Sequence, residues 1–125
     1  DPPPEISTAG MPMADFTPPQ LVSPKAFEAL TRIPIQIVFG DYVRDQPRDQ
    51  YHSVLWRRVA QRAEQFAKAV NTRGGNVEIL HLPDAGLRGN THFPFADLNN
   101  LAVADKLSEF LAKHGLDGWR DLRNG

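Results

Sequence analysis

The sequence predicts an α/β fold in which two parallel strands are joined by a crossover helix. The first observation is a run of β-branched and aromatic residues, IPIQIVFG at residues 33–40, that ends in a glycine. The second is the stretch 54–72, where apolar side chains recur every three or four positions, as in an amphipathic helix. The third is another strand pattern, NVEILHLP at residues 76–83. Strand, helix and strand in series predict a right-handed parallel connection.

The composition is typical of one globular unit and argues against several classes of partner. The chain has 125 residues, of which 41% are hydrophobic, and this is enough to form a core. Lysine and arginine number 14 against 15 aspartates and glutamates, so we expect neither a nucleic-acid nor a membrane partner. Because the sequence contains no cysteine, thiol nucleophiles and thiolate zinc sites are excluded. No metal and no organic cofactor is implied.

The chain divides into three segments. Residues 1–24 hold seven of the eleven prolines and predict an extended segment without regular structure. Residues 25–117 form the α/β part. Its short first helix overlaps the end of the preceding segment, with Ser23 as a possible N-cap and Pro24 at the first helical position. Residues 118–125 read as a tail. Since the first residue is not methionine, we expect that a longer polypeptide was cut near the proline-rich segment.

Two strands do not make a stable sheet on their own. Both predicted strands are largely apolar on both faces, and no third strand pattern accompanies them in the sequence. The final helix, predicted within residues 97–115, has Leu101, Leu107 and two further apolar residues on one face. We therefore expect strands from another polypeptide to complete the sheet.

His92 lies in a glycine-entered loop, GNTHFPF, between the second strand and the final helix. Reactive groups of open α/β sheets gather outside the carboxyl ends of the strands, and this loop follows such an end. Gly86 and Gly89 would let the loop turn back over the sheet. We predict that His92 is a general base, and the alternative is a structural histidine that only fixes its loop. His81 and His114 lie in a strand and at a helix end, where packing is the simpler role.

Several acidic and amide side chains flank this histidine in sequence or in the predicted fold. Asp41 and Asp45 follow the first strand, where an acid could orient a histidine or simply cap a turn. Gly89, Asn90, Asp97 and Asn99 could support the histidine loop, although helix capping is the default role for such residues. No serine stands in a Gly-x-Ser-x-Gly setting, so the sequence carries no recognisable nucleophile.

Residues 33–116 resemble the C-terminal third of an α/β-hydrolase esterase. In this resemblance IPIQIVFGD is the penultimate strand, and the last strand, the histidine loop and the final helix follow. A narrower similarity is to bacterial and fungal serine esterases that carry GN-(S/T)-H followed by D-x-NN-x-x-(V/I)-AD. These motifs correspond here to residues 89–92 and 97–105.

The resemblance implies a serine, histidine and glutamate triad in which His92 is the histidine. The serine would lie upstream in Gly-x-Ser-x-Gly, and the acid would be a glutamate after the strand that precedes residue 33. The more common arrangement has an aspartate three residues after the strand-ending glycine, where this sequence has Val43. Asp41 is off that register and remains the alternative acid. Serine and glutamate would therefore belong to a separate N-terminal chain.

Two hypotheses follow for the function. The first is that the chain is the C-terminal part of a serine esterase acting on a small-molecule ester, active only together with its N-terminal chain. The second is a non-catalytic α/β fragment or binding module with a structural loop histidine. The residues identify neither the ester nor the oligomeric state. They do not fix the localisation either, although cutting of a loop would suit a secreted protein.

Overall fold

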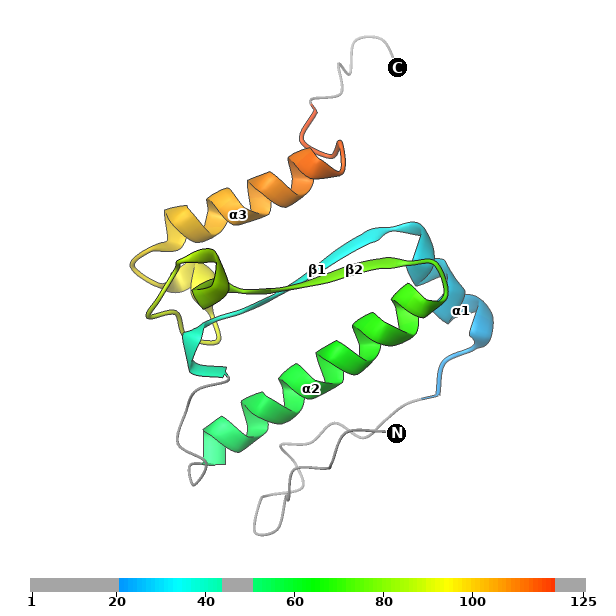
Figure 1. Ribbon diagram of the computed structural model, residues 1–125, viewed down its shortest axis with the longest axis horizontal. Coiled ribbons are helices and arrows are strands. Elements are labelled where there is room, and N and C mark those ends of the chain that lie inside the picture. The colour runs from blue at the N-terminus through cyan, green and yellow to red at the C-terminus, as the bar shows by residue number, and fades with distance from the viewer. Residues whose placement is uncertain (1–20, 44–50, 119–125) are drawn as a thin grey trace.

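The computed structural model describes residues 21–43 and 51–118 of the chain (Figure 1). Most of the proline-rich segment, the tail from residue 119 and Asp45 therefore lie outside the described residues. Short 3₁₀ helices occupy several of the connections. The helices and strands are, in chain order, α1 (Pro24–Ala29), β1 (Pro34–Phe39), α2 (Tyr51–Thr72), β2 (Asn76–His81) and α3 (Asn100–Lys113).

The two strands form the parallel pair that the sequence predicts. Ile35 lies opposite Val77 and Phe39 lies opposite His81, with no slip along the pair. Among the described residues the sheet contains only these two strands, so each has one edge without a partner strand. Because the strands are parallel and joined by α2, their carboxyl ends lie at the same edge of the sheet (Figure 1).

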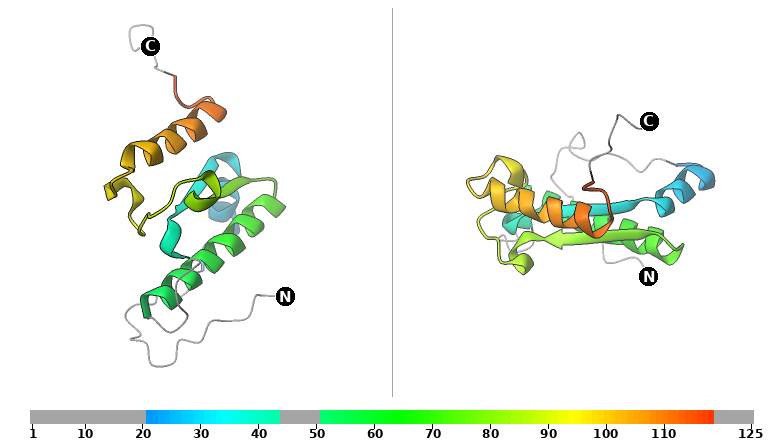
Figure 2. Two further views of the ribbon diagram at one scale, coloured as in Figure 1. Left: turned by 60° about the vertical axis from the view of Figure 1, so that its left-hand side comes forward. Right: turned by 90° about the horizontal axis from the view of Figure 1, so that it is seen from above.

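α2 covers one face of the strand pair, and α3 lies on the opposite side (Figures 1 and 2). The core between α2 and the strands consists of two groups of buried residues: Phe39, Val43 and Ala60, and Ala67, Val70 and Val77. Val59 belongs to the apolar positions that recur every three or four residues within 54–72, and this pattern predicts that it is buried. In the structure Val59 is 36% exposed and Ala60 is buried. The helix turns its alanines towards the sheet because small side chains allow its backbone to lie close to the strands.

α3 buries a different face from the one that the sequence pattern predicted. Val103 and Phe110 are buried, whereas Leu101 and Leu107 are 78% and 41% exposed. The helical period alone defines several neighbouring apolar stripes, and the element that packs on the helix selects one of them. Here Phe110 and its neighbours face the strands, so Leu101 and Leu107 are left exposed.

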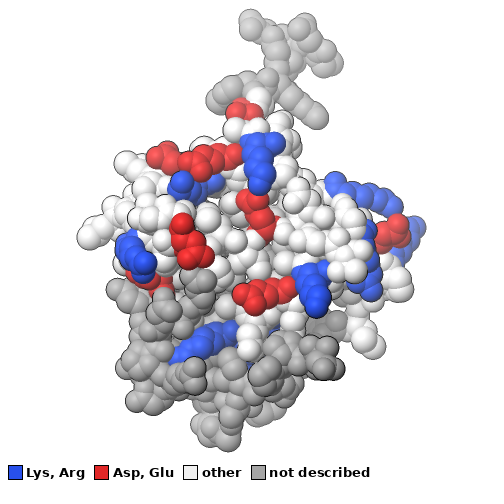
Figure 3. All heavy atoms as spheres, in the orientation of Figure 1, with Lys and Arg blue, Asp and Glu red and all other residues white. Residues whose placement is uncertain are grey.

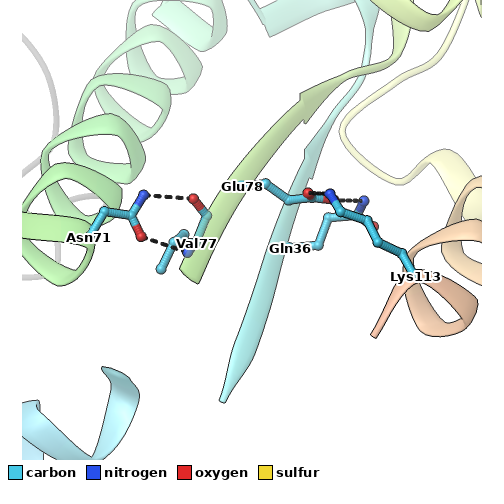
Figure 4. A network of polar contacts seen from close by, with 5 residues as sticks. All are labelled: Gln36, Asn71, Val77, Glu78 and Lys113. Carbon is cyan, nitrogen blue, oxygen red and sulfur yellow. Dashed lines mark hydrogen bonds and ion pairs between the residues drawn. The ribbon is translucent and has the colours of Figure 1, made fainter. Parts of the chain in front are cut away.

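The strand face towards α3 carries a polar contact (Figure 4). Gln36 and Glu78 lie opposite each other in the parallel pair, and the Gln36 amide donates to the Glu78 carboxylate at 2.8 Å. Lys113 of α3 donates to the second Glu78 oxygen at 2.7 Å. The Lys113 hydrogen bond lowers the pKa of Glu78, and the Gln36 bond adds to the effect, while burial opposes both. Glu78 of β2 therefore connects α3 to both strands, since it binds Lys113 of α3 and Gln36 of β1.

On the other side of β2, one side chain of α2 fixes the start of the strand (Figure 4). The Asn71 amide donates to the carbonyl oxygen of Val77 at 2.9 Å and accepts from the Val77 N–H at 2.7 Å. A single side chain thus satisfies both polar groups of a buried residue. This double contact fixes where the chain leaves α2 and enters the sheet.

The surface charges are mixed in sign on the face that Figure 3 shows, as the nearly balanced composition predicts. Acidic and basic side chains alternate there, so that face has no patch of one sign. No helix within residues 21–43 and 51–118 is long and apolar enough to cross a membrane.

The Lys113 contact predicts a pH-dependent contribution to stability. Because the folded pKa of Glu78 is lowered, this contribution is complete above the unfolded pKa and disappears as the pH falls through the folded pKa. We expect Lys113→Met to lower the free energy of unfolding at neutral pH by about 1 kcal/mol or less, since both side chains are partly exposed. Urea unfolding at a series of pH values measures the difference between variant and wild type, which should vanish in acid.

Lys106→Met is the matched control because it removes the same charge from α3, where Lys106 pairs with Glu109 on the helix surface. A difference between Lys113→Met and wild type that stayed constant from neutral to acidic pH would contradict the assigned contact.

Candidate active site

The histidine loop lies at the carboxyl ends of both strands. After β2 the chain makes a 3₁₀ helix, Leu82–Ala85, which Leu82 anchors through its fully buried side chain. Gly86 ends this helix in a left-handed conformation with φ 82°, and its N–H donates to the carbonyl of Pro83. That conformation suits glycine and turns the chain back towards β1. The loop therefore returns over the edge of the sheet, as the sequence predicts.

The loop is joined to the end of β1 by its backbone. The Asp41 N–H donates to the Asn90 carbonyl at 2.9 Å, and the Gly89 N–H donates to the Asp41 carboxylate at 2.8 Å. Gly40 lies directly under the loop, and a Cβ atom there would lie 2.3 Å from the Thr91 carbonyl oxygen. Only glycine at position 40 allows this close approach.

Asn90 is the buried centre of the loop, with 0% of its surface exposed. Its amide nitrogen donates to the Asp97 carboxylate at 3.1 Å and to the Asn99 oxygen at 2.6 Å. Its oxygen accepts from the Asn99 amide at 2.9 Å. The structure thus brings together three of the predicted supporting residues. Asn99 stands at the N-cap position of α3, but its side chain bonds Asn90 instead of capping the helix.

Asp97 and Thr91 together fix the backbone on both sides of the histidine. Its carboxylate accepts from the Thr91 N–H at 2.9 Å and from the Thr91 hydroxyl at 3.0 Å. The Thr91 hydroxyl oxygen in turn accepts from the Phe93 N–H at 3.2 Å. Burial raises the pKa of Asp97, but the hydrogen bonds from Thr91 and Asn90 outweigh it, so the pKa is lowered. The carboxylate is therefore charged at neutral pH, and His92 sits between two anchored residues.

The His92 side chain is exposed and stacks on Trp56 of α2. The two ring centroids are 4.9 Å apart and the ring planes differ by 25°. The described residues form no hydrogen bond to the imidazole. Trp56 was not among the site residues predicted from the sequence. Its signal was available in the buried stripe of α2, because Trp56 lies one turn before Ala60 and so faces the same edge of the sheet.

The remaining candidates lie elsewhere. The Asp41 carboxylate contacts the Gly89 N–H and lies 3.6 Å from Arg88, and no contact joins it to His92 among the described residues. His81 stacks on Phe39 with centroids 5.6 Å apart, and His114 meets Phe110 edge to face. Within residues 21–43 and 51–118, no three acidic or histidine side chains gather as a metal site.

A comparison with solved structures finds a bacterial esterase that is 33% identical to this chain, with a TM-score of 0.57. The match covers 74% of this chain but only 27% of the esterase chain. No protein-family model matches the sequence, and a search of curated proteins finds no significant relative. The likeness supports an esterase-like α/β fold. The parallel strands, their crossover helix and α3 fit the C-terminal part of an α/β-hydrolase fold, as the sequence predicts.

Because the loop lies so close to Gly40, adding a single methyl group at this position should destabilise the fold. We expect Gly40→Ala to lower the free energy of unfolding by about 1–3 kcal/mol, because the loop carbonyls must move to admit the new Cβ. Denaturant unfolding measures the loss, and amide chemical shifts of residues 89–92 report the movement of the loop.

Gly118→Ala is the control, since a Cβ atom there meets nothing within 4 Å. If Gly40→Ala matched Gly118→Ala in stability and left the loop shifts unchanged, the close packing of the loop on β1 would be wrong.

Proposed function

We propose that this chain is the C-terminal part of a serine carboxylic-ester hydrolase and that His92 is its general base. The observation that carries the proposal is the placement of His92. Its backbone is anchored on both sides at the carboxyl edge of a parallel sheet, while its imidazole remains exposed. The likeness to a bacterial esterase supports the reaction class. A purely structural histidine would have less reason to present its ring to solvent.

The chemistry needs a base because a serine hydroxyl is too weakly acidic to attack an ester unaided. His92 would accept the hydroxyl proton as the serine oxygen bonds to the ester carbonyl carbon, and would return the proton to the departing alkoxide. The same imidazole would then activate water to release the acyl group. An anchored backbone supports this role, because the base must stay within hydrogen-bond reach of the hydroxyl in both steps.

The remaining catalytic groups would come from a separate N-terminal chain of the same hydrolase. These groups are the serine of a Gly-x-Ser-x-Gly turn, the amides that stabilise the oxyanion, and the triad glutamate. No serine of this sequence has that setting. Asp41 is a weaker choice for the acid, because its carboxylate already accepts from Gly89 and lies near Arg88.

The described surface supports such a partner. Each strand has one edge without a neighbouring strand in the described part of the chain, and free edges of apolar strands favour pairing. Within the histidine loop and directly after it, a group of large apolar side chains is exposed, comprising Phe93, Phe95, Leu98 and Leu101. An exposed apolar group next to a catalytic residue is typical of a surface that another polypeptide or a substrate covers.

The proposal predicts that His92→Ala abolishes hydrolysis in the enzyme that contains this chain. Turnover of a simple aryl ester should fall by roughly three to six orders of magnitude, with little change in stability, because triad members act as a unit. His114→Ala is the control, since the His114 ring packs against Phe110 away from the loop. A His92→Ala protein whose folded fraction still hydrolyses the ester at a normal rate would instead favour the non-catalytic binding module.

The partner chain is tested by labelling the active preparation with a fluorophosphonate, which reacts with activated serines. We expect the label on a second polypeptide that contains Gly-x-Ser-x-Gly and co-purifies with this chain, as intact-mass and peptide mass spectrometry would establish. Label on one continuous polypeptide that contains both segments would refute the separate chain but retain the esterase. Label on a serine of this chain would refute the assignment of the nucleophile.

A further inference from the structure

We infer that Trp56 is a positioning residue that holds the imidazole of His92 in its working orientation. The inference rests on the proposed function and deepens it. Its starting point is the stack of the two rings, with centroids 4.9 Å apart and planes 25° from parallel. The indole belongs to α2 and the imidazole to the loop after β2, so the contact joins two elements that are distant in the sequence.

Trp56 is itself held by the core. Its side chain packs against the buried group of Phe39, Val43 and Ala60 while its ring meets His92. Because the buried group is close-packed, the plane of the indole is fixed by residues that also fix the sheet. The position of the His92 ring is thereby fixed relative to the core through Trp56.

The loop hydrogen bonds alone do not determine where the imidazole points. They anchor Thr91 and Phe93 through backbone and hydroxyl groups, and this leaves the two side-chain torsions of His92 unconstrained. No hydrogen bond reaches the ring from the described residues, and the stack with Trp56 is a contact that restricts it. Stacking occupies a face of the ring and leaves the two edge nitrogens accessible for a proton donor and an orienting acid.

The stack also suits the charge that His92 would carry during the reaction. When the imidazole accepts the serine proton it becomes a cation, and the face of an indole attracts a cation more strongly than that of phenylalanine. An aliphatic side chain of similar size would fill space but would offer no such attraction. The contribution of Trp56 should therefore appear in turnover, where the imidazolium forms, rather than in binding of the ester.

The kinetic test compares three variants of the enzyme that contains this chain, assayed on an aryl ester. We expect Trp56→Leu to lower kcat by roughly tenfold with KM nearly unchanged, and Trp56→Phe to recover most of the loss. Phe66→Leu is the matched control, because Phe66 is an aromatic residue of the same helix that packs on the core without touching a histidine. It should reduce stability and leave kcat unchanged.

An NMR measurement on the same enzyme, isotope-labelled in this chain, tests the contact independently of activity. The ring protons of His92 should be shifted upfield by the indole, and Trp56→Leu should remove the shift while Phe66→Leu retains it. Ring shifts that Trp56→Leu leaves unchanged would overturn the inference. If Trp56→Leu does not fold, Trp56→Phe must give both a smaller ring shift and an intermediate kcat.

The two levels of the proposal fail in different ways. If the ring shift is present and His92→Ala is inactive, but Trp56→Leu has wild-type kcat, then Trp56 does not position the base and the esterase assignment stands. If His92→Ala itself remains active, the proposed function fails, and the inference fails with it even when the rings are stacked.

Discussion

The hydrogen bond from the Asp41 N–H to the Asn90 carbonyl is the contact on which the rest of the histidine loop depends. It joins the end of β1 to the loop that follows β2, and it can form only because Gly40 has no side chain to separate them. Once these backbones meet, the loop lies over the carboxyl edge instead of extending into solvent. Buried Asn90 and exposed His92 are consequences of this one close approach.

The hydrogen bonds of Asn90 restrict the loop to a single conformation. Its amide exchanges hydrogen bonds with Asn99 and also donates to Asp97, so a fully buried polar side chain finds partners for both its oxygen and its nitrogen. Leaving such a group without partners would cost about 1–3 kcal/mol, and any loop shape that separates these residues incurs that cost. The network therefore selects one arrangement more strongly than its modest net stabilisation suggests.

The sequence predicts the features that depend on local residue patterns, and it misses the features that depend on how closely two elements pack together. The parallel strands, the crossover helix and the Ser23 cap are confirmed, because period and capping chemistry are written in neighbouring residues. The buried faces of α2 and α3 are shifted from the predicted ones, since several stripes are apolar and the packing partner chooses between them. The sequence allowed Asn99 either to cap α3 or to support the histidine loop, and the structure shows that its side chain bonds Asn90. The stack of Trp56 on His92 could not be predicted from the helical pattern, because it depends on how closely α2 approaches the loop.

In the proposed enzyme, the division between the two chains follows from which groups this chain can hold unaided. His92 has its backbone fixed by Asp97 through Thr91, and its ring rests on an indole anchored in the core. All of these contacts lie within residues 21–43 and 51–118, so the base would be oriented before any partner docks. Association would then need to align only one rigid edge with the serine and its acid. Preorganisation of this kind lowers the entropic cost of assembling a catalytic group from two polypeptides.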